Sequence, residues 1–303
     1  MSHQEKRDPA RRSSAGAPAG SVSRHARKYR ENRYVYPVLS RRSRGISIGI
    51  NLNPDKICNW DCIYCQVDRT TPPLVRDVDE ALLRDELREM LAQAKDGALF
   101  DRPEFRAVPD ALRFVRDITF AGDGEPCSYP NFGGVVRDAV RLKEEAGFGD
   151  LKLILLSNAT LLDRPRVQEA LALMDRSHGE YWLKLDAGTE EYYRLIDRST
   201  IPLEKVLRNI LITARVRPVV LQSLFMKVRG EGPPPAEIDA YCDRVRGILD
   251  GGGAISLIQV YTVARPPAES FVTALSDAEV DALASSIGDR VRIPVETFYS
   301  GHA

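Results

Sequence analysis

The sequence has no apolar run of about 18 residues, the length that a membrane-spanning helix needs, so no membrane span is expected. It also has no excess charge of either sign, because 43 Lys and Arg residues balance 43 Asp and Glu residues. Overall charge therefore gives no argument for nucleic-acid binding. No apolar segment follows the charged N-terminus, so we expect no secretory signal. The cysteines number only five, which argues against a disulfide framework and fits a reducing, cytoplasmic setting.

Three of these cysteines, Cys58, Cys62 and Cys65, lie close together with the spacing C-x3-C-x2-C. Three thiolates so close together can bind one face of a soft metal or an iron–sulfur cluster. A four-iron cluster with three protein ligands keeps one iron for another ligand. A closed structural zinc site needs four ligands, and no fourth Cys or His lies nearby in the sequence. The alternatives are a zinc site completed by a remote ligand, or ordinary thiols.

Strand and helix patterns alternate along the rest of the chain. We expect strands at 46–52, 114–121, 151–156, 181–185, 219–225 and 255–263. Helices are expected between them, one opening at Asp77 with Glu80 as its capping-box partner and another capped by Asn131. A last helix begins at Ser276-x-x-Glu279, and 291–298 is a candidate edge strand because Pro294 cannot donate to a ladder. Six alternations predict a parallel α/β protein, and an open (βα)6 partial barrel and a doubly wound sheet both fit.

Unusual polar residues follow the ends of the predicted strands. They are the cysteine loop after the first strand, Gly122 to Glu125 after the second, Ser157 and Asn158 after the third, and Lys184 and Asp186 at the fourth. Chemistry in parallel α/β barrels gathers at the carboxyl ends of the strands. The sequence therefore predicts one site on one face of the sheet.

The cysteine spacing, with Tyr64 directly before the last cysteine, resembles the radical S-adenosylmethionine (SAM) superfamily. The flanks look like its wyosine-synthase-related (4-demethylwyosine synthase-like) branch, and the likeness covers roughly residues 36 to 268. The segments that carry it are 40–52, 65–67, 120–126 and 185–188. The resemblance implies a partial TIM-type barrel and a [4Fe–4S] cluster on Cys58, Cys62 and Cys65, with SAM on the open iron. One electron, from a donor such as flavodoxin or ferredoxin, would cleave SAM to a 5′-deoxyadenosyl radical.

The same resemblance implies where SAM binds. The stretch Gly122, Asp123, Gly124 and Glu125 looks like the Gly-Gly-Glu motif that holds the methionine amino group, with Asp123 departing from the commonest form. Glycines also allow close backbone approach to a ligand, and Glu125 offers acceptors to an ammonium. A Gly-Asp-Gly stretch by itself is more often only a turn.

Further positions are assigned in the same way. Ser157 and Asn158 match a Thr-Asn-Gly position near the ribose or carboxylate, although Ala159 replaces the glycine; the alternative is a helix-capping pair. Lys184 and Asp186 either bind ribose or carboxylate groups or pair with each other, and Tyr64 is a candidate for adenine contact. Weaker candidates on the last strands are Gln222, Met226 and Gln259.

The other two cysteines and a histidine have less specific signals. Cys127 is a candidate catalytic residue, as a hydrogen-atom donor or a further metal ligand, although a plain buried thiol is the more ordinary interpretation. Cys242 is expected on a helix, with its side chain in the protein core. His178 is expected in an exposed loop.

Domain organisation and substrate are the remaining expectations. Residues 1–33 form an expected disordered basic tail, 34–265 the partial-barrel core, and 266–303 a C-terminal helix and strand extension. The tail either meets RNA phosphates or is simply solvated, and Arg41, Arg42 and Arg44 face either an anionic substrate or solvent. No Cys precedes Cys58, so the second cluster of the wyosine enzymes is not expected. The substrate class is left open between a tRNA base, a peptide and a small molecule. The competing function is an iron–sulfur or metal-binding sensor or electron-transfer module without SAM cleavage.

Overall fold

The computed structural model of the chain describes residues 32–301. The expected tail, 1–33, lies almost wholly outside the described residues. No helix among residues 32–301 is long and apolar enough to cross a membrane.

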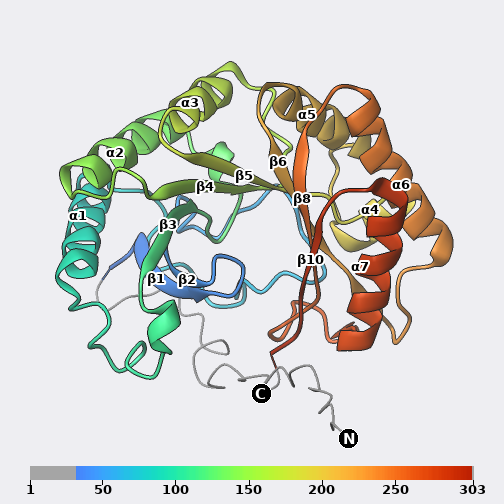
Figure 1. The fold of residues 1–303 in the computed structure, drawn as a ribbon, viewed down its shortest axis with the longest axis horizontal. Helices are drawn as coiled ribbons and strands as arrows, with labels where there is room; N and C mark the ends of the chain where they lie inside the picture. Colours follow the sequence, from blue (N-terminus) through green and yellow to red (C-terminus); the bar gives the residue numbers. More distant parts are fainter. Residues whose placement is uncertain (1–31, 302–303) are drawn as a thin grey trace, which may run out of the picture.

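The described chain is built on one curled sheet of eight strands, arranged β1-β2-β3-β4-β5-β6-β8-β10 (Figure 1). The strands are β1 (Val35–Ser40), β2 (Gly45–Ile50), β3 (Val115–Phe120), β4 (Lys152–Ser157), β5 (Gly179–Lys184), β6 (Val219–Leu224), β8 (Ile255–Tyr261) and β10 (Val295–Phe298). Within this sheet β1 pairs antiparallel with β2, and the other neighbouring strands, from β2 through β3, β4, β5, β6 and β8 to β10, are parallel. A two-stranded sheet of β7 (Met226–Val228) and β9 (Val272–Ala274) is separate.

The order of the parallel strands decides between the two predicted architectures. It follows the order of the chain from one edge to the other, with no point at which the order reverses. A doubly wound sheet has such a reversal, and a barrel does not. The two edge strands, β1 and β10, do not pair with each other, so the barrel is open. The predicted partial TIM-type barrel is therefore confirmed.

Helices follow the strands and cover the outer face of the sheet (Figure 1). They are α1 (Glu80–Asp96), α2 (Phe132–Glu145), α3 (Pro165–Asp175), α4 (Glu190–Ile196), α5 (Leu203–Val216), α6 (Pro235–Asp250) and α7 (Asp277–Val291). Two short 3-10 turns, η1 (Asp110–Leu112) and η2 (Pro126–Ser128), complete the list of elements. The main apolar core lies between the sheet and these helices, and a smaller cluster around Ile154, Trp182 and Val220 faces the inside of the barrel.

Strand β1 was not predicted from the sequence. It contains Pro37, which lacks an N–H and is tolerated because β1 is an edge strand. Its start is fixed by the buried carboxylate of Glu86 in α1, which accepts the backbone N–H groups of Arg33, Tyr34 and Val35 at 2.7–3.0 Å. This long-range contact has no local sequence signature.

The predicted start of α1 was wrong by two residues. The cap is Asp79, whose side chain accepts from the backbone N–H groups of Ala81 and Leu82, and not Asp77. Glu80 instead accepts from the side chains of Tyr129 and Asn131. Asn131 is the N-cap residue of α2 by position. Its side chain makes no capping hydrogen bond to the start of the helix.

The C-terminal segment behaves as its capping signal predicts and also adds an edge strand to the open barrel. Ser276 and Glu279 form the expected capping box at the start of α7. The candidate edge strand is present as β10, and Pro294 lies just before it. Because β10 pairs in parallel with β8, the segment expected as an extension adds a strand to the main sheet.

Candidate active site

The cysteine loop follows β2 and is fastened at both the backbone and the side-chain level. The N–H groups of Asp61 and Ile63 donate to the carbonyls of Asp197 and Ile196, at 3.1 and 2.8 Å, just after and at the end of α4. The side chain of Asn59 donates to Thr160 at 2.7 Å, beyond β4. The loop between the first two cysteines is therefore held by segments that lie more than 100 residues further along the chain.

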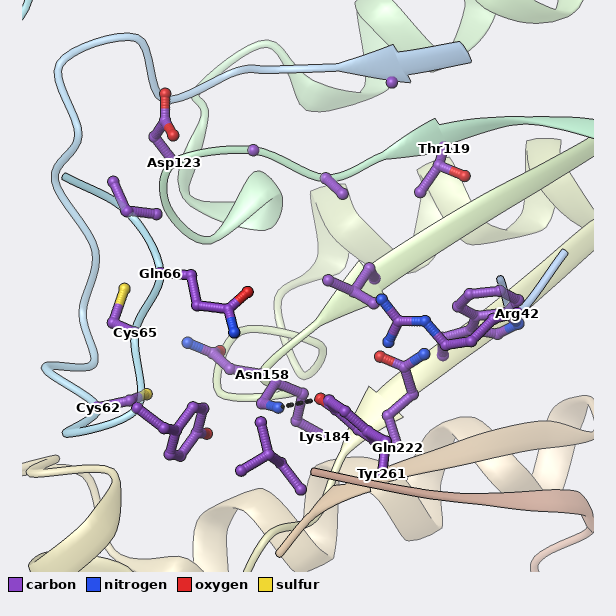
Figure 2. A pocket seen from close by; sticks show the side chains of 18 of the residues that line it. Arg42, Cys62, Cys65, Gln66, Thr119, Asp123, Asn158, Lys184, Gln222 and Tyr261 are labelled. Atoms are coloured by element: carbon purple, nitrogen blue, oxygen red, sulfur yellow. Dashed lines mark hydrogen bonds between the residues drawn. The ribbon is translucent and has the colours of Figure 1, made fainter. Parts of the chain in front are cut away.

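All three predicted cluster ligands line one cavity of about 330 Å³ at the carboxyl ends of the strands. Figure 2 labels two of them, Cys62 and Cys65. Cys58, Cys62 and Cys65 are each partly buried and free of disulfides. Burial raises the pKa of the Cys58 thiol and raises that of Cys62 well above its ordinary value. The guanidinium of Arg69 lies 3.7 Å from the Cys65 sulfur and is placed to offset negative charge on this loop.

The thiols fit a cluster better than they fit one metal ion. Among residues 32–301, no three His, Cys, Asp or Glu side chains are grouped so that they could hold a metal ion. A tetrahedral zinc needs its ligands to converge on one point, whereas a four-iron cluster spreads its thiolates over separate irons. Three thiols on one loop that open into one cavity are compatible with a [4Fe–4S] cluster that has an open iron.

The glycines of the turn after β3 permit close packing against the segment that leads into the cysteine loop. A Cβ on Gly122 would stand 2.1 Å from the side-chain oxygen of Asn51, and one on Gly124 would stand 2.1 Å from the carbonyl oxygen of Ile57. Asn51 also donates to the Asp123 carboxylate at 2.7 Å and accepts from the Asp123 N–H at 3.1 Å. The turn lines the cavity and is fitted to the cysteine loop, so its glycines have a packing reason that sequence reasoning missed.

Glu125 is a buried carboxylate that connects two strand ends. Its oxygens accept from the Ser157 hydroxyl at 2.8 Å, the Asn158 N–H at 2.8 Å and the Cys127 N–H at 3.1 Å. Burial raises the pKa of Glu125, and the hydrogen bonds from Asn158, Ser157 and Cys127 oppose that rise. Glu125 lines the cavity, and of its roughly four acceptor sites the fourth is taken only by the Cys127 thiol, a weak donor that a stronger one can replace.

The turn after β4 keeps the conformation that the resemblance associates with glycine. Ala159 has a φ of 62°, in the left-handed region that glycine adopts most easily. The Ser157 hydroxyl accepts from the Ala159 N–H at 3.0 Å, and the Asn158 amide donates to Asn59 of the cysteine loop at 2.7 Å. Ser157 and Asn158 line the cavity, and neither caps a helix, since α3 begins after Arg164.

Lys184 and Asp186 pair with each other, which is the alternative that the sequence left open. Their closest approach is 3.1 Å, and Lys184 also donates to the Tyr261 hydroxyl at 2.8 Å (Figure 2). Burial lowers the pKa of Lys184, but the charge of Asp186 and the contact with Tyr261 outweigh it and raise the pKa overall. Asp186 additionally accepts the Leu224 N–H at 2.8 Å. Lys184 lines the cavity, whereas buried Asp186 does not.

Tyr64 connects the third cysteine to this pair. Its hydroxyl lies 2.6 Å from Asp186 and 2.7 Å from Asp197, and the Lys184 ammonium lies 5.1 Å from its ring centroid. The pKa of Asp197 is raised well above its ordinary value, by burial first and then by the charge of Asp186. Tyr64 lines the cavity as predicted for a cofactor contact.

The two remaining cysteines lie outside the cavity, although Cys127 contacts two residues that line it, Glu125 and Ser157. Cys127 is fully buried and does not line the cavity, so the structure places it as the buried thiol that was the more ordinary interpretation. Burial raises its pKa well above the ordinary value. Cys242 is buried in α6, as expected. Met226 is buried outside the cavity as well, while Gln222 lines it.

Several cavity residues had no signal in the sequence because they are isolated polar or aromatic positions on separate elements. They are Arg42, Trp60, Gln66, Thr119, Trp182, Tyr261 and Arg265. Gln66 lies in segment 65–67, which carries part of the family resemblance, but the resemblance assigns its side chain no role. Arg42 is one of three arginines whose direction the sequence leaves open. Side chains alternate between the two faces of a strand, so the sequence could have assigned Thr119, Trp182 and Tyr261 each to one face of its strand. It could not have shown that this face lines the inside of the barrel.

Comparison with known proteins identifies the family. Residues 52–233 match the model of the Radical SAM superfamily. Curated relatives include a protein called GTPase Obg from Brachyspira hyodysenteriae, 28% identical over 62% of this chain and 24% of that protein. They also include UPF0026 proteins from Helicobacter pylori J99 (26% identical, 64% of this chain, 56% of that protein) and Methanocaldococcus jannaschii (28%, 58% and 47%). The chain thus spans between a quarter and just over half of the length of these relatives.

One solved structure has a similar fold, and a second matches at a lower similarity score. Streptococcus suis SuiB bound to S-adenosylmethionine matches with a TM-score of 0.52 at 14% identity, over 83% of this chain and 48% of that one. TYW1 with a lysine-pyruvate adduct matches with a TM-score of 0.47 at 15% identity, over 82% and 74%. The family model covers more than half of the 303 residues and contains the three cysteines. The chain therefore belongs to the radical SAM superfamily, whose members are enzymes.

Proposed function

We propose that Cys58, Cys62 and Cys65 hold a [4Fe–4S] cluster and that SAM binds beside it in the cavity. The observation that carries the proposal is the convergence of the three thiols, the Gly122 to Glu125 turn, Asn158 and Lys184 on one cavity. When bound, the cluster supplies the electron that cleaves SAM to a 5′-deoxyadenosyl radical, which abstracts hydrogen from a substrate. The reductant is proposed to be a flavodoxin or ferredoxin.

The chain's own residues supply distinct contacts for SAM. The fourth acceptor site of Glu125 suits the methionine ammonium, and the Lys184 ammonium suits its carboxylate. Tyr64 and Asn158 offer aromatic and amide surface to the nucleoside. Asp186 orients Lys184 and Tyr64 and contacts no ligand, because it is buried behind them.

The apolar walls of the cavity exclude water from the reacting groups. Trp60, Leu156 and Leu224 line it together with the polar residues. Exclusion of water protects a reactive intermediate from side reactions. Positioning and protection are the protein's share of the chemistry, and the cofactor carries the bond cleavage.

The test is anaerobic purification, reconstitution with iron and sulfide, and addition of dithionite and SAM, followed by quantification of 5′-deoxyadenosine. We expect product from the wild type and from Cys242→Ala, and none from Cys62→Ala. Electron paramagnetic resonance of the reduced cluster gives a second readout, since SAM bound to the open iron shifts its signal. A loaded cluster that yields no product and shows no shift would contradict the proposal and favour an electron-transfer or sensing module.

Cys127 provides a further discrimination. A sensing module with four cysteine ligands predicts that Cys127→Ala or Cys242→Ala lowers the iron content. The proposed enzyme predicts that only substitution of the three loop cysteines does so, because Cys127 does not line the cavity.

A further inference from the structure

The three arginines of the turn between β1 and β2 have three different environments. The Arg41 side chain donates to the backbone carbonyl of Tyr299, across the open edge of the barrel. Arg44 is exposed, 3.7 Å from Glu296. Arg41 and Arg42 both line the cavity, and Figure 2 shows the Arg42 guanidinium directed towards its middle. The three arginines therefore do not share one environment. Arg44 faces solvent, whereas Arg42 lines the cavity.

Aromatic rings flank the Arg42 guanidinium. Its central carbon lies 5.1 Å from the ring centroid of Tyr261 and 5.6 Å from that of Trp182. Such contacts orient a guanidinium and favour its charge, but they leave its N–H groups free to donate. Within residues 32–301, the Arg42 guanidinium contacts these two rings and forms no hydrogen bond or ion pair. A cation that is partly removed from water and lacks an anion is a ready partner for an anionic ligand.

A second, independent group faces the same space. Gln222 in β6 is fully buried, and its amide nitrogen donates to Gln259 at 2.6 Å. Its side-chain oxygen has no hydrogen-bond partner, although a buried acceptor without a donor is destabilising. Gln222 lines the cavity, and Figure 2 places it beside Arg42. The unpartnered Gln222 oxygen can accept a hydrogen bond from a donor group of a ligand.

The cavity thus has two chemically different ends. The cysteines lie after the carboxyl end of β2, whereas Arg42 precedes the amino end of the same strand. Arg42 also borders a second hollow at the far end of the barrel, so it forms part of the floor between the two. A ligand whose anion meets Arg42 would extend from the floor towards the cofactor end.

We infer that the substrate is a small carboxylic acid with a hydroxyl or amino group next to its carboxylate. The carboxylate takes the forked N–H groups of Arg42, and the adjacent donor fills the Gln222 oxygen. The turn that carries Arg42 is held across the barrel opening through Arg41, which argues against entry of a polynucleotide backbone at this end. This inference deepens the proposed function and depends on it for the location of the cofactor.

The test is ligand-observed saturation-transfer NMR on the reconstituted full chain with SAM, using L-lactate as the probe and neutral L-lactamide as its matched partner. A charge-assisted pair contributes about 1.5–3 kcal/mol, so we expect lactate to bind at least about tenfold more tightly than lactamide. Arg42→Gln should abolish this preference, and Arg42→Lys should restore part of it. Arg44→Gln, an exposed arginine of the same turn, is the matched control and should keep it.

The role of Gln222 is tested with propionate, which lacks the hydroxyl. Propionate should bind more weakly than lactate to the wild type, and Gln222→Leu should remove that difference. Equal binding of lactate and lactamide, an anion preference that survives in Arg42→Gln, or preferential binding of inorganic phosphate would overturn the inference. Because binding is measured without SAM cleavage, lactate binding with no 5′-deoxyadenosine would instead count against the proposed function alone.

Discussion

The hydroxyl of Tyr64, next to the third cysteine, lies 2.6 Å from the carboxylate of Asp186, two residues beyond β5. The contact connects residues that are 122 positions apart and joins the cysteine loop to the barrel wall. Asp186 is held in turn by Lys184 and by a backbone N–H of Leu224. The loop that carries the thiols is therefore held by a buried polar network of the chain's own residues.

Tyr64→Phe should destabilise the protein by roughly 1–3 kcal/mol, because it removes the hydroxyl that lies between two buried carboxyl groups and is a hydrogen-bond partner of both. It should also speed hydrogen exchange of the Ile63 and Cys65 amides, whose bonds lie in the same loop. Tyr299→Phe is the control, since its hydroxyl contacts a partly exposed Asp281, and it should change stability by less than about 0.5 kcal/mol. Equal effects of the two substitutions in urea unfolding would show that the network does not hold the loop.

Gly124→Ala should destabilise the protein and lower the iron content after reconstitution, because the added methyl group meets the Ile57 carbonyl. Overpacking of this kind costs about 1–3 kcal/mol. The control is Gly247→Ala on the exposed face of α6, where no atom lies within 4 Å of the added Cβ. That change should stabilise by up to about 1 kcal/mol through helix propensity. A Gly124→Ala protein with wild-type stability and full iron would show that the turn can move away from the loop.

Much of the fold and of the site was readable from the sequence because the signals were local. Cysteine spacing, apolar runs that end in polar turns, and the Ser276-x-x-Glu279 capping box each lie within a few residues. The ligand candidates Cys58, Cys62 and Cys65 converge on the cavity for that reason. The spatial order of the strands was not predicted from the sequence, and in the structure it follows the order of the chain.

What the sequence did not predict depends on contacts between distant segments. Strand β1 depends on Glu86, and the direction of Arg42 depends on Trp182 and Tyr261. Asp186 was a candidate ligand contact from its place at a strand end, yet it lies behind Lys184. Local pattern assigns a side chain to a strand end, but only tertiary packing decides whether it faces the cavity.

Glu86→Gln should destabilise the protein because one carboxylate accepts three backbone N–H groups at the start of β1. The amide offers only one acceptor oxygen, and loss of charge-assisted hydrogen bonds costs roughly 1.5–3 kcal/mol. Glu89→Gln, on the exposed face of the same helix, should have an effect below about 0.5 kcal/mol. Urea unfolding compares the two, and faster exchange at Tyr34 and Val35 in Glu86→Gln alone would locate the loss at the edge strand. Unchanged exchange there would contradict the proposed anchor.

Asp117, at the amino end of β3, makes stability depend on pH in a direction opposite to that of most carboxylates. Burial raises its pKa, although hydrogen bonds from Thr119, Ser43 and Ser47 lower it in part, and the charge of Glu180 adds to the rise. Arg116, Lys152 and Glu296 line the same hollow. A carboxyl whose folded pKa exceeds its unfolded value stabilises the fold fully below the unfolded pKa. That contribution is lost as the pH rises through the folded pKa.

Asp117→Asn isolates this contribution because the amide stays neutral and keeps an acceptor for Thr119 or Ser47. We expect the stability of the wild type relative to Asp117→Asn to fall from about pH 4 upward and to level off above the folded pKa. Urea unfolding at several pH values measures the difference. Asp243→Asn, in an exposed pair with Arg246, is the control and should show little change over the same range. If the wild type instead became more stable relative to Asp117→Asn as the pH rises, the hydroxyl donors would stabilise the Asp117 carboxylate by more than its burial costs.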